Sequence, residues 1–268
     1  MAAQVGLYVP GNRPDRFAKA ASSGADLVVI DLEDAVPAQD KARAREAVME
    51  WFGAGQGDGS PDFQVRVNPG VPEDLDAVRE IAPEITIRLP KVQGPRDVDA
   101  AVSRAPGHAV VALLETAQGI LAAPSVAGHE AVVGLAVGES DLRSEIGAAP
   151  AVKDFARMSV VFAARAAGLP APLLSVYPAI TDLQGLEEDT RRGLDMGFGG
   201  RMAIHPRQIA SIRRALHPAG EDVAWATEVV SALPDGGVAR LADGQMVDPA
   251  MLGRARAILE RAGVDAGM

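Results

Sequence analysis

Eight short apolar runs, each followed by a segment with helical patterning, organise the first 217 residues of the chain. The runs cover Val5–Val9, Leu27–Leu32, Gln64–Val67, Ile85–Leu89, Ala109–Leu114, Ala131–Val137, Leu173–Val176 and Arg201–Ile204. Continuous apolar runs are typical of strands buried on both faces, and their alternation with helices predicts a parallel sheet with right-handed crossovers. Eight such units favour a closed (β/α)₈ TIM barrel over an open sheet, and no Gly-x-Gly-x-x-Gly sequence follows the first run.

The helices between these runs are expected over residues 13–22, 38–52, 73–81, 95–103, 119–126, 152–167, 183–196 and 206–216. Beyond residue 217 the alternation of strand and helix patterns ends. Residues 221–233 and 249–262 have helical patterns, and the Gly-rich stretch 235–246 between them predicts a hairpin or loop. Because residues 218–268 are surplus to the barrel, we expect them to form a lid or an oligomerisation arm of the same domain.

The composition restricts the partners of the chain. Its 268 residues carry a formal net charge of −10, which argues against a nucleic-acid surface because phosphate binding needs a basic patch. The sequence contains no run of 18 apolar residues, so no membrane-spanning helix is expected. The absence of cysteine excludes disulfides and thiolate metal sites and fits the reducing cytoplasm. A small-molecule ligand is the class of partner that remains.

Two carboxylates follow successive predicted strands. Glu115 comes directly after the fifth run, and Asp141 lies just beyond the sixth. The carboxyl ends of barrel strands build the active site, and a pair of acids there suggests a divalent cation with oxygen ligands, such as Mg²⁺. The alternative is that both acids stabilise helix N-termini, which for Asp141 alone is at least as good an explanation.

A second acidic group follows the second run, where Asp31, Glu33 and Asp34 fall within four residues. Not all can bind a metal, and we expect Glu33 and Asp34 to hold metal-bound waters, unless they form a solvated cluster on the rim. Arg66 lies inside the apolar run Val65–Val67, where a cation needs a partner. That partner is a substrate oxygen or an ion pair with Glu33 or Asp34, and the two are compatible.

Other kinds of active site have little support. Lys91, after the fourth run, is a weaker equivalent of Arg66. Of the four histidines only His205 follows a predicted strand, and His205-Pro206 is expected to shape the start of a helix. The sequence has no convincing Ser-His-Asp arrangement and no histidine pair at zinc spacing.

Nine segments together resemble the citrate lyase β-subunit-like family of the HpcH/HpaI aldolase superfamily. They are Leu7–Ala20, Val29–Val36, Val65–Asn68, Leu89–Lys91, Leu114–Gly119, Gly138–Leu142, Gly197–Arg201, Ile204–Ile209 and Gly244–Asp248. The segments follow one another in order along nearly the whole chain, so the resemblance is specific to this family.

The resemblance implies a Mg²⁺-dependent TIM barrel that makes or breaks C–C bonds of 3-hydroxyacyl-CoA thioesters, such as citryl-, malyl- or citramalyl-CoA, through a metal-stabilised enolate. It implies that Glu115 and Asp141 bind the metal and that Arg66 is a catalytic residue that holds substrate oxygens. Glu115 itself, Arg16 and Lys91 are further substrate contacts that it suggests. Asp248 matches the tail aspartate that in some members reaches a neighbouring subunit's site, where it is a plausible acid or base. A homotrimer or hexamer is expected on the same basis.

Several alternatives stay open at this point. The chain could be an acyl-CoA thioesterase, an aldolase on free 2-oxo acids, or the carrier-protein-dependent citryl lyase subunit of a citrate lyase complex. A catalytically silent scaffold is the remaining class. The sequence does not choose the acyl group, the stereochemistry or the direction of the reaction.

Overall fold

The computed structural model describes residues 4–55, 61–147, 149–234 and 236–264. Contacts divide the chain into two compact units, Met1–Ile212 and Arg213–Met268, and the division falls inside helix α10 (Ile209–Leu216). Sequence patterning places the boundary slightly later, at residue 217. Within the described ranges, no helix is both long and apolar enough to span a bilayer.

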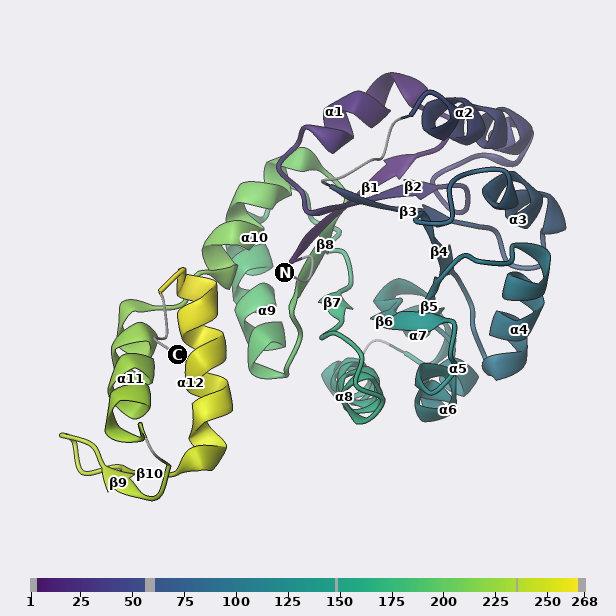
Figure 1. Ribbon diagram of the computed structural model, residues 1–268. Coiled ribbons are helices and arrows are strands. Elements are labelled where there is room, and N and C mark those ends of the chain that lie inside the picture. The colour runs from purple at the N-terminus through teal and green to yellow at the C-terminus, as the bar shows by residue number, and fades with distance from the viewer. Residues whose placement is uncertain (1–3, 56–60, 148, 235, 265–268) are drawn as a thin grey trace. The chain divides into compact units, whose positions relative to one another are not determined.

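The first unit is a closed barrel of eight parallel strands, in which each strand pairs with its neighbours in chain order and β8 pairs with β1 (Figure 1). The strands are β1 (Val5–Pro10), β2 (Leu27–Asp31), β3 (Asp62–Arg66), β4 (Thr86–Leu89), β5 (Val110–Leu114), β6 (Val132–Val137), β7 (Leu173–Leu174) and β8 (Gly200–Ala203). The predicted (β/α)₈ barrel with a helical C-terminal region is therefore confirmed.

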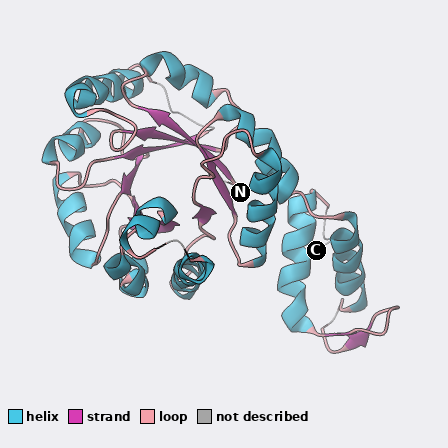
Figure 2. Cartoon of the chain, turned by 180° about the vertical axis from the view of Figure 1, so that it is seen from behind, coloured by secondary structure: helices cyan, strands magenta, loops and turns pink. Residues whose placement is uncertain are grey.

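The helices of this unit surround the barrel strands, most of them on the outside (Figure 2). They are η1 (Pro14–Arg16), α1 (Phe17–Ala21), η2 (Ala38–Asp40), α2 (Lys41–Gly53), α3 (Pro72–Arg79), α4 (Pro95–Arg104), α5 (Ala117–Leu121), α6 (Ala123–Ala127), α7 (Glu139–Glu145), α8 (Pro150–Ala166), α9 (Leu183–Asp195), η3 (Pro206–Gln208) and α10. The helix expected over 119–126 is two short helices that meet at Ala122, because Pro124 cannot continue the hydrogen bonding of α5 and instead begins α6.

Side-chain alternation along the strands separates the outer core from the barrel interior. Val28 and Ile30 of β2 are fully buried on the face that the helices cover, whereas Leu27 and Val29 pack inside the barrel with Met202. The same alternation directs polar residues at the carboxyl ends of the strands inward. Apolar runs therefore form the strands, and their ends supply the polar groups of a site.

The second unit contains α11 (Gly220–Ala232), α12 (Pro249–Ala262) and a short antiparallel pair, β9 (Ala239–Arg240) with β10 (Met246–Val247). The hairpin expected over 235–246 is confirmed except at residue 235, which lies outside the described residues. A separate apolar core holds the unit together, with buried residues Ala226, Val229, Leu233, Leu241, Val247, Ala255, Ile258 and Leu259.

Candidate active site

A cavity of about 330 Å³ opens at the carboxyl ends of the barrel strands. Tyr8 of β1, Asp31 of β2 and Arg66 of β3 line it on one side, and Glu115 and Asp141 line it on the other. Each comes from the interior face of a strand or from the loop or helix that follows it. Side chains from several strands of the first unit thus meet at the end of the barrel where TIM-barrel enzymes carry out catalysis.

Glu115 and Asp141 line this cavity, and only Asp141 has the position at a helix N-terminus that the alternative explanation describes. Glu115 is 4% exposed, and its Oε1 accepts a hydrogen bond from the backbone N–H of Lys91 at 3.0 Å. Asp141 lies in the first turn of α7, and its Oδ2 is 3.6 Å from Nζ of Lys91. The N-terminus of α5 is instead capped by Thr116, which accepts from Gly119 N–H. The carboxylate of Glu115 therefore has no structural task as a cap.

The electrostatics of the cavity favour a bound cation. Burial, and after it the charges of Glu33 and Asp141, raise the pKa of Glu115 to about 8. Burial likewise raises the pKa of Glu33 to about 7, although Arg66 opposes the shift. Buried carboxylates that repel one another in this way are stabilised by a cation between them.

The donor set of the cavity fits a hard cation with few protein ligands. Among the described residues, no group of three or more His, Cys, Asp or Glu is arranged to hold a metal. Mg²⁺ commonly takes one or two carboxylates and completes its shell with water and substrate oxygens. Glu115 and Asp141 match this pattern.

Arg66 is held by the acidic group that follows β2. Its Nε and Nη2 each donate to one oxygen of Asp31 at 2.7 Å, and its Nη1 lies 2.8 Å from Glu33 and 3.2 Å from Asp34. The ion pair expected with Glu33 or Asp34 is present, but the bidentate partner is Asp31. Strand register could have identified it, because Asp31 and Arg66 are paired neighbours at the ends of β2 and β3.

The remaining residues that the sequence singled out lie at different places relative to the cavity. Lys91 is partly exposed, and it is the only non-glycine residue with a positive φ (54°) within the described ranges. Arg16 is exposed at the end of η1 and does not line the cavity. Asp248 lies in the second unit, where its Oδ1 accepts from Ala250 N–H and caps α12. His205 shapes the start of η3 as expected, since its Nδ1 accepts from Arg207 N–H.

A buried ion-pair network behind α7 was not anticipated from the sequence. Arg157 of α8 is fully buried and binds Glu139 of α7 (2.7 Å) and Asp189 of α9 (2.8 Å), and Arg201 of β8 also binds Asp189. The network holds Glu139 two residues before Asp141, so it fixes the helix that presents this carboxylate. Arg201 begins the eighth apolar run, directly after Gly199-Gly200, so it does not interrupt the run as Arg66 does.

Comparison with known proteins places this geometry in a family. The profile of the HpcH/HpaI aldolase/citrate lyase family matches residues 4–206. A citrate lyase subunit β-like protein of Mycobacterium tuberculosis is 36% identical over 96% of this chain and 94% of its own length. A (3S)-malyl-CoA thioesterase of Cereibacter sphaeroides is 32% identical over 96% of this chain and 93% of its own length.

Two further relatives extend the likeness. The mitochondrial citramalyl-CoA lyase of Homo sapiens is 31% identical over 93% of this chain and 82% of its own length. The solved structure of the protein CitE from M. tuberculosis, in complex with magnesium, acetoacetate and coenzyme A, has a TM-score of 0.85 and 34% identity, covering 98% of this chain and 99% of that one. With a matching barrel, a matching profile and relatives along its whole length, the chain belongs to the HpcH/HpaI aldolase/citrate lyase family.

Proposed function

We propose that the protein is a Mg²⁺-dependent carbon–carbon lyase, or the corresponding condensing enzyme, acting on 3-hydroxyacyl-CoA thioesters such as citryl-, malyl- or citramalyl-CoA. The observation that carries the proposal is the pair of carboxylates Glu115 and Asp141 on the cavity wall opposite Arg66, in a family that includes CoA-thioester lyases. CitE of M. tuberculosis, whose structure holds magnesium and coenzyme A, supports the cofactor and the substrate class.

Each residue has a role in this proposal. Glu115 and Asp141 hold the magnesium ion, which when bound supplies Lewis-acid stabilisation of negative charge on a substrate oxygen. Arg66 donates N–H groups to the oxygen on which charge develops, and its ion pairs with Asp31, Glu33 and Asp34 keep the guanidinium in position. Glu33 and Asp34 also accept hydrogen bonds from the waters of the metal.

Three further residues complete the proposed site. Lys91, whose pKa is raised because nearby acids outweigh the effect of burial, pairs with anionic substrate oxygens. Arg16 is an exposed guanidinium at the end of η1, which follows β1, and it suits a phosphate group of CoA. Asp248 is the acid or base at the α-carbon of the thioester; only its Oδ1 is used by the cap of α12.

We also propose that the protein assembles into a homotrimer or hexamer in the cytoplasm. Large apolar side chains are exposed on neighbouring helices: Leu121 (74% exposed) on α5, and Phe155 (60%) and Phe162 (68%), seven residues apart on α8. Exposed apolar groups of this size are typical of subunit interfaces. Replacing both phenylalanines by Glu is expected to dissociate the assembly, as measured by light scattering; an unchanged mass would locate the interface elsewhere.

A thioesterase is the second candidate. The (3S)-malyl-CoA thioesterase of C. sphaeroides is 32% identical, close to the identity of the lyase relatives. Both reactions need a polarised thioester carbonyl, so the same residues serve either one. The products separate them, because hydrolysis releases free CoA whereas C–C cleavage releases a shorter acyl-CoA and an oxo compound.

The test is product analysis by mass spectrometry after incubation with malyl-, citramalyl-, citryl- and 3-hydroxy-3-methylglutaryl-CoA, with Mg²⁺ or with EDTA. We expect Mg²⁺-dependent release of a shorter acyl-CoA from at least one substrate, and loss of that activity in Glu115→Gln. Glu130→Gln, which changes an exposed carboxylate before β6, is the matched control and should remain active. Turnover of none of the four substrates contradicts the proposal, and CoA release alone supports the thioesterase.

A further inference from the structure

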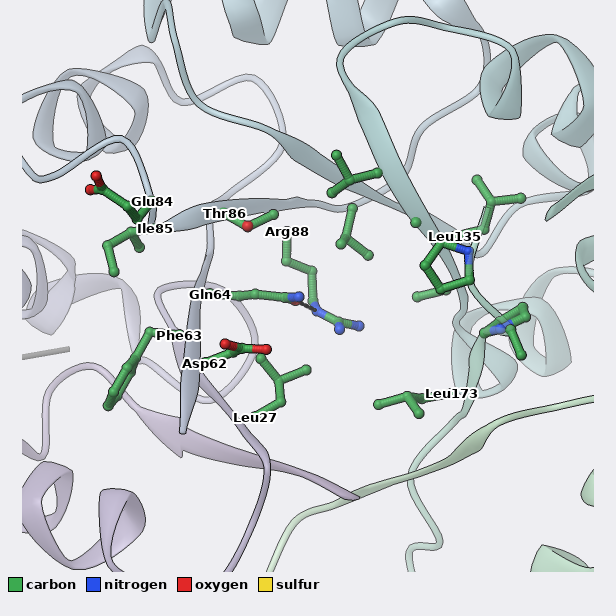
Figure 3. Close-up of a pocket in the computed structure, with 17 residues that line it drawn as sticks. Leu27, Asp62, Phe63, Gln64, Glu84, Ile85, Thr86, Arg88, Leu135 and Leu173 are labelled. Atoms are coloured by element: carbon green, nitrogen blue, oxygen red, sulfur yellow. Dashed lines mark hydrogen bonds between the residues drawn. The ribbon is translucent and has the colours of Figure 1, made fainter. Parts of the chain in front are cut away.

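The interior of the barrel is not one continuous apolar core. Leu27, Val29 and Met202 form one buried cluster, and Val111, Leu113 and Ala136 form a separate one. Between these clusters, polar side chains of β3 and β4 occupy the space that layers of branched apolar residues normally fill. Figure 3 shows Arg88 extending into the centre of this space, where Gln64 meets it.

Arg88 is buried without a carboxylate. The residue is 3% exposed, and its two hydrogen bonds go to neutral groups: Nε donates to Oε1 of Gln64 at 2.9 Å and Nη1 to the hydroxyl of Tyr8 at 3.4 Å. Among the residues that the structure describes, it forms no ion pair. A guanidinium carries more N–H groups than these two bonds use, and burying its charge is costly without an anion.

The other buried arginines behave differently. Arg157 and Arg201 are also nearly inaccessible, and both bind the carboxylate of Asp189. Arg66 lies beside Arg88 in the register of β3 and β4, and it is surrounded by three acids. Arg88 is therefore the exception among the buried arginines that the structure describes, and no described residue supplies the anion that its charge calls for.

The position of Arg88 connects it to the active site. It lines the cavity that contains Glu115 and Asp141, and also a second cavity of about 670 Å³ at the opposite end of the barrel. The ring of Tyr8 contacts both cations, with Cζ of Arg66 5.2 Å and Cζ of Arg88 5.7 Å from its centroid. Gln64 and Tyr8 fix the guanidinium from two sides, so that it is oriented before a ligand arrives.

We propose that Arg88 is a specificity-determining residue that binds a carboxylate on the part of the substrate that enters the barrel. The inference rests on the proposed function, in which C–C cleavage of malyl-, citramalyl- or citryl-CoA releases a shorter acyl-CoA and a 2-oxo acid. It narrows the substrate class to thioesters whose 2-oxo acid fragment carries a second carboxylate. A carboxylate is the anion that suits a planar guanidinium presented by a neutral amide and a hydroxyl.

The test compares two probes of matched shape by titration calorimetry in the presence of Mg²⁺. Oxaloacetate carries a distal carboxylate, and 4-methyl-2-oxopentanoate has an uncharged isopropyl group in its place. We expect the wild-type protein to bind oxaloacetate about tenfold more tightly or better, as hydrogen bonds to a buried charge imply. Arg88→Met should abolish this preference by weakening oxaloacetate alone, and Arg88→Lys should restore part of it.

The matched control is Arg96→Met, which removes an exposed arginine of α4 and should leave both affinities unchanged. Equal affinity of the wild-type protein for the two acids overturns the inference, and this comparison does not depend on any variant folding. An undiminished preference in Arg88→Met also overturns it. Failure of both acids to bind in a Mg²⁺-dependent way contradicts the proposed function as well, whereas equal binding of both acids contradicts only the role of Arg88.

Discussion

Glu115 combines a buried position with a neighbourhood that opposes its charge. Burial first, then the carboxylates of Glu33 and Asp141, raise its pKa from an ordinary value near 4.5 to about 8. Without a cation the folded protein therefore holds a proton on Glu115 that the unfolded chain releases. The stabilisation from this proton is complete below pH 4.5 and is lost as the pH rises through 8.

Glu115→Gln should make this dependence visible. Glutamine has the same shape, can accept the Lys91 N–H bond and carries no charge at any pH. In EDTA we expect the melting temperature of the variant to exceed that of wild type at pH 8.5, with a difference that shrinks toward pH 5. Saturating Mg²⁺ should reverse the order at pH 8.5, because only the wild-type carboxylate binds the ion. Differential scanning fluorimetry measures this, and a difference independent of pH in EDTA contradicts the electrostatic account.

For the buried arginines, the sequence alone predicts that a partner is needed but does not predict which residue it is. Arg66 could be recognised because it interrupts an apolar run, and Arg88 interrupts the run of β4 in the same way, whereas Arg201 begins the run of β8 after two glycines. What the sequence does not contain is the identity of each partner. Arg157 and Asp189 are 32 residues apart on different helices, so their pairing depends on how α8 and α9 pack. The sequence therefore indicates that a buried cation needs an anion, and the fold decides which one.

At the scale of elements, the apolar runs predict all eight strands, and errors concentrate where proline intervenes. β7 is only Leu173–Leu174 rather than Leu173–Val176, in a segment bounded by Pro172 and Pro178. The helix expected from residue 13 begins as the 3₁₀ turn η1 at Pro14 before α1. These deviations leave the order of the strands unchanged, so the residues at the strand ends still reach one cavity.

The turn between β6 and α7 depends on a glycine that has no side chain to contribute. A Cβ atom at Gly138 would lie 2.4 Å from Oε2 and 2.5 Å from Cβ of Glu115. We expect Gly138→Ala to displace Glu115, weaken Mg²⁺ binding at least about tenfold, or about 1.4 kcal/mol, and lower stability by about 1–3 kcal/mol. Titration calorimetry and chemical denaturation measure the two effects.

Gly134, within β6 itself, is the matched control. A Cβ atom there would approach only Cγ2 of Val111, at an ordinary 3.5 Å. Gly134→Ala should therefore bind Mg²⁺ within about twofold of wild type, a difference below 0.5 kcal/mol. Equal metal affinity of the two alanine variants would show that the space at Gly138 does not position Glu115.

At the scale of the whole molecule, the open question is what the second unit, Arg213–Met268, contributes to function. Its core is built from its own helices and hairpin, and Asp248 begins α12 as a capping residue. Capping alone would explain an aspartate at this position, so the proposed acid–base role needs a separate test. Asn caps a helix as well as Asp does but cannot exchange a proton in the same way, so Asp248→Asn separates the two roles.

Mixed oligomers test whether Asp248 completes a neighbouring subunit's site. The Glu115→Gln and Asp248→Asn proteins are each expected to be inactive. Each chain in the mixture carries only one of the two substitutions, so it keeps the other side chain intact. If the aspartate acts in trans, random co-assembly of the two variants restores about a quarter of the wild-type activity, because one interface in four combines two intact parts. Mixtures that stay inactive after verified co-assembly would assign Asp248 to its own subunit or to capping alone.

The most direct measurement of the central claim is the anomalous diffraction of Mn²⁺-soaked crystals, with Mn²⁺ replacing Mg²⁺. We expect a single strong anomalous peak in the cavity at the carboxyl ends of the strands, about 2.0–2.3 Å from one carboxylate oxygen of Glu115 and one of Asp141. The peak should disappear in Glu115→Gln. A fully soaked crystal with no peak between these two carboxylates, or with its strongest peak elsewhere on the chain, would contradict the claim.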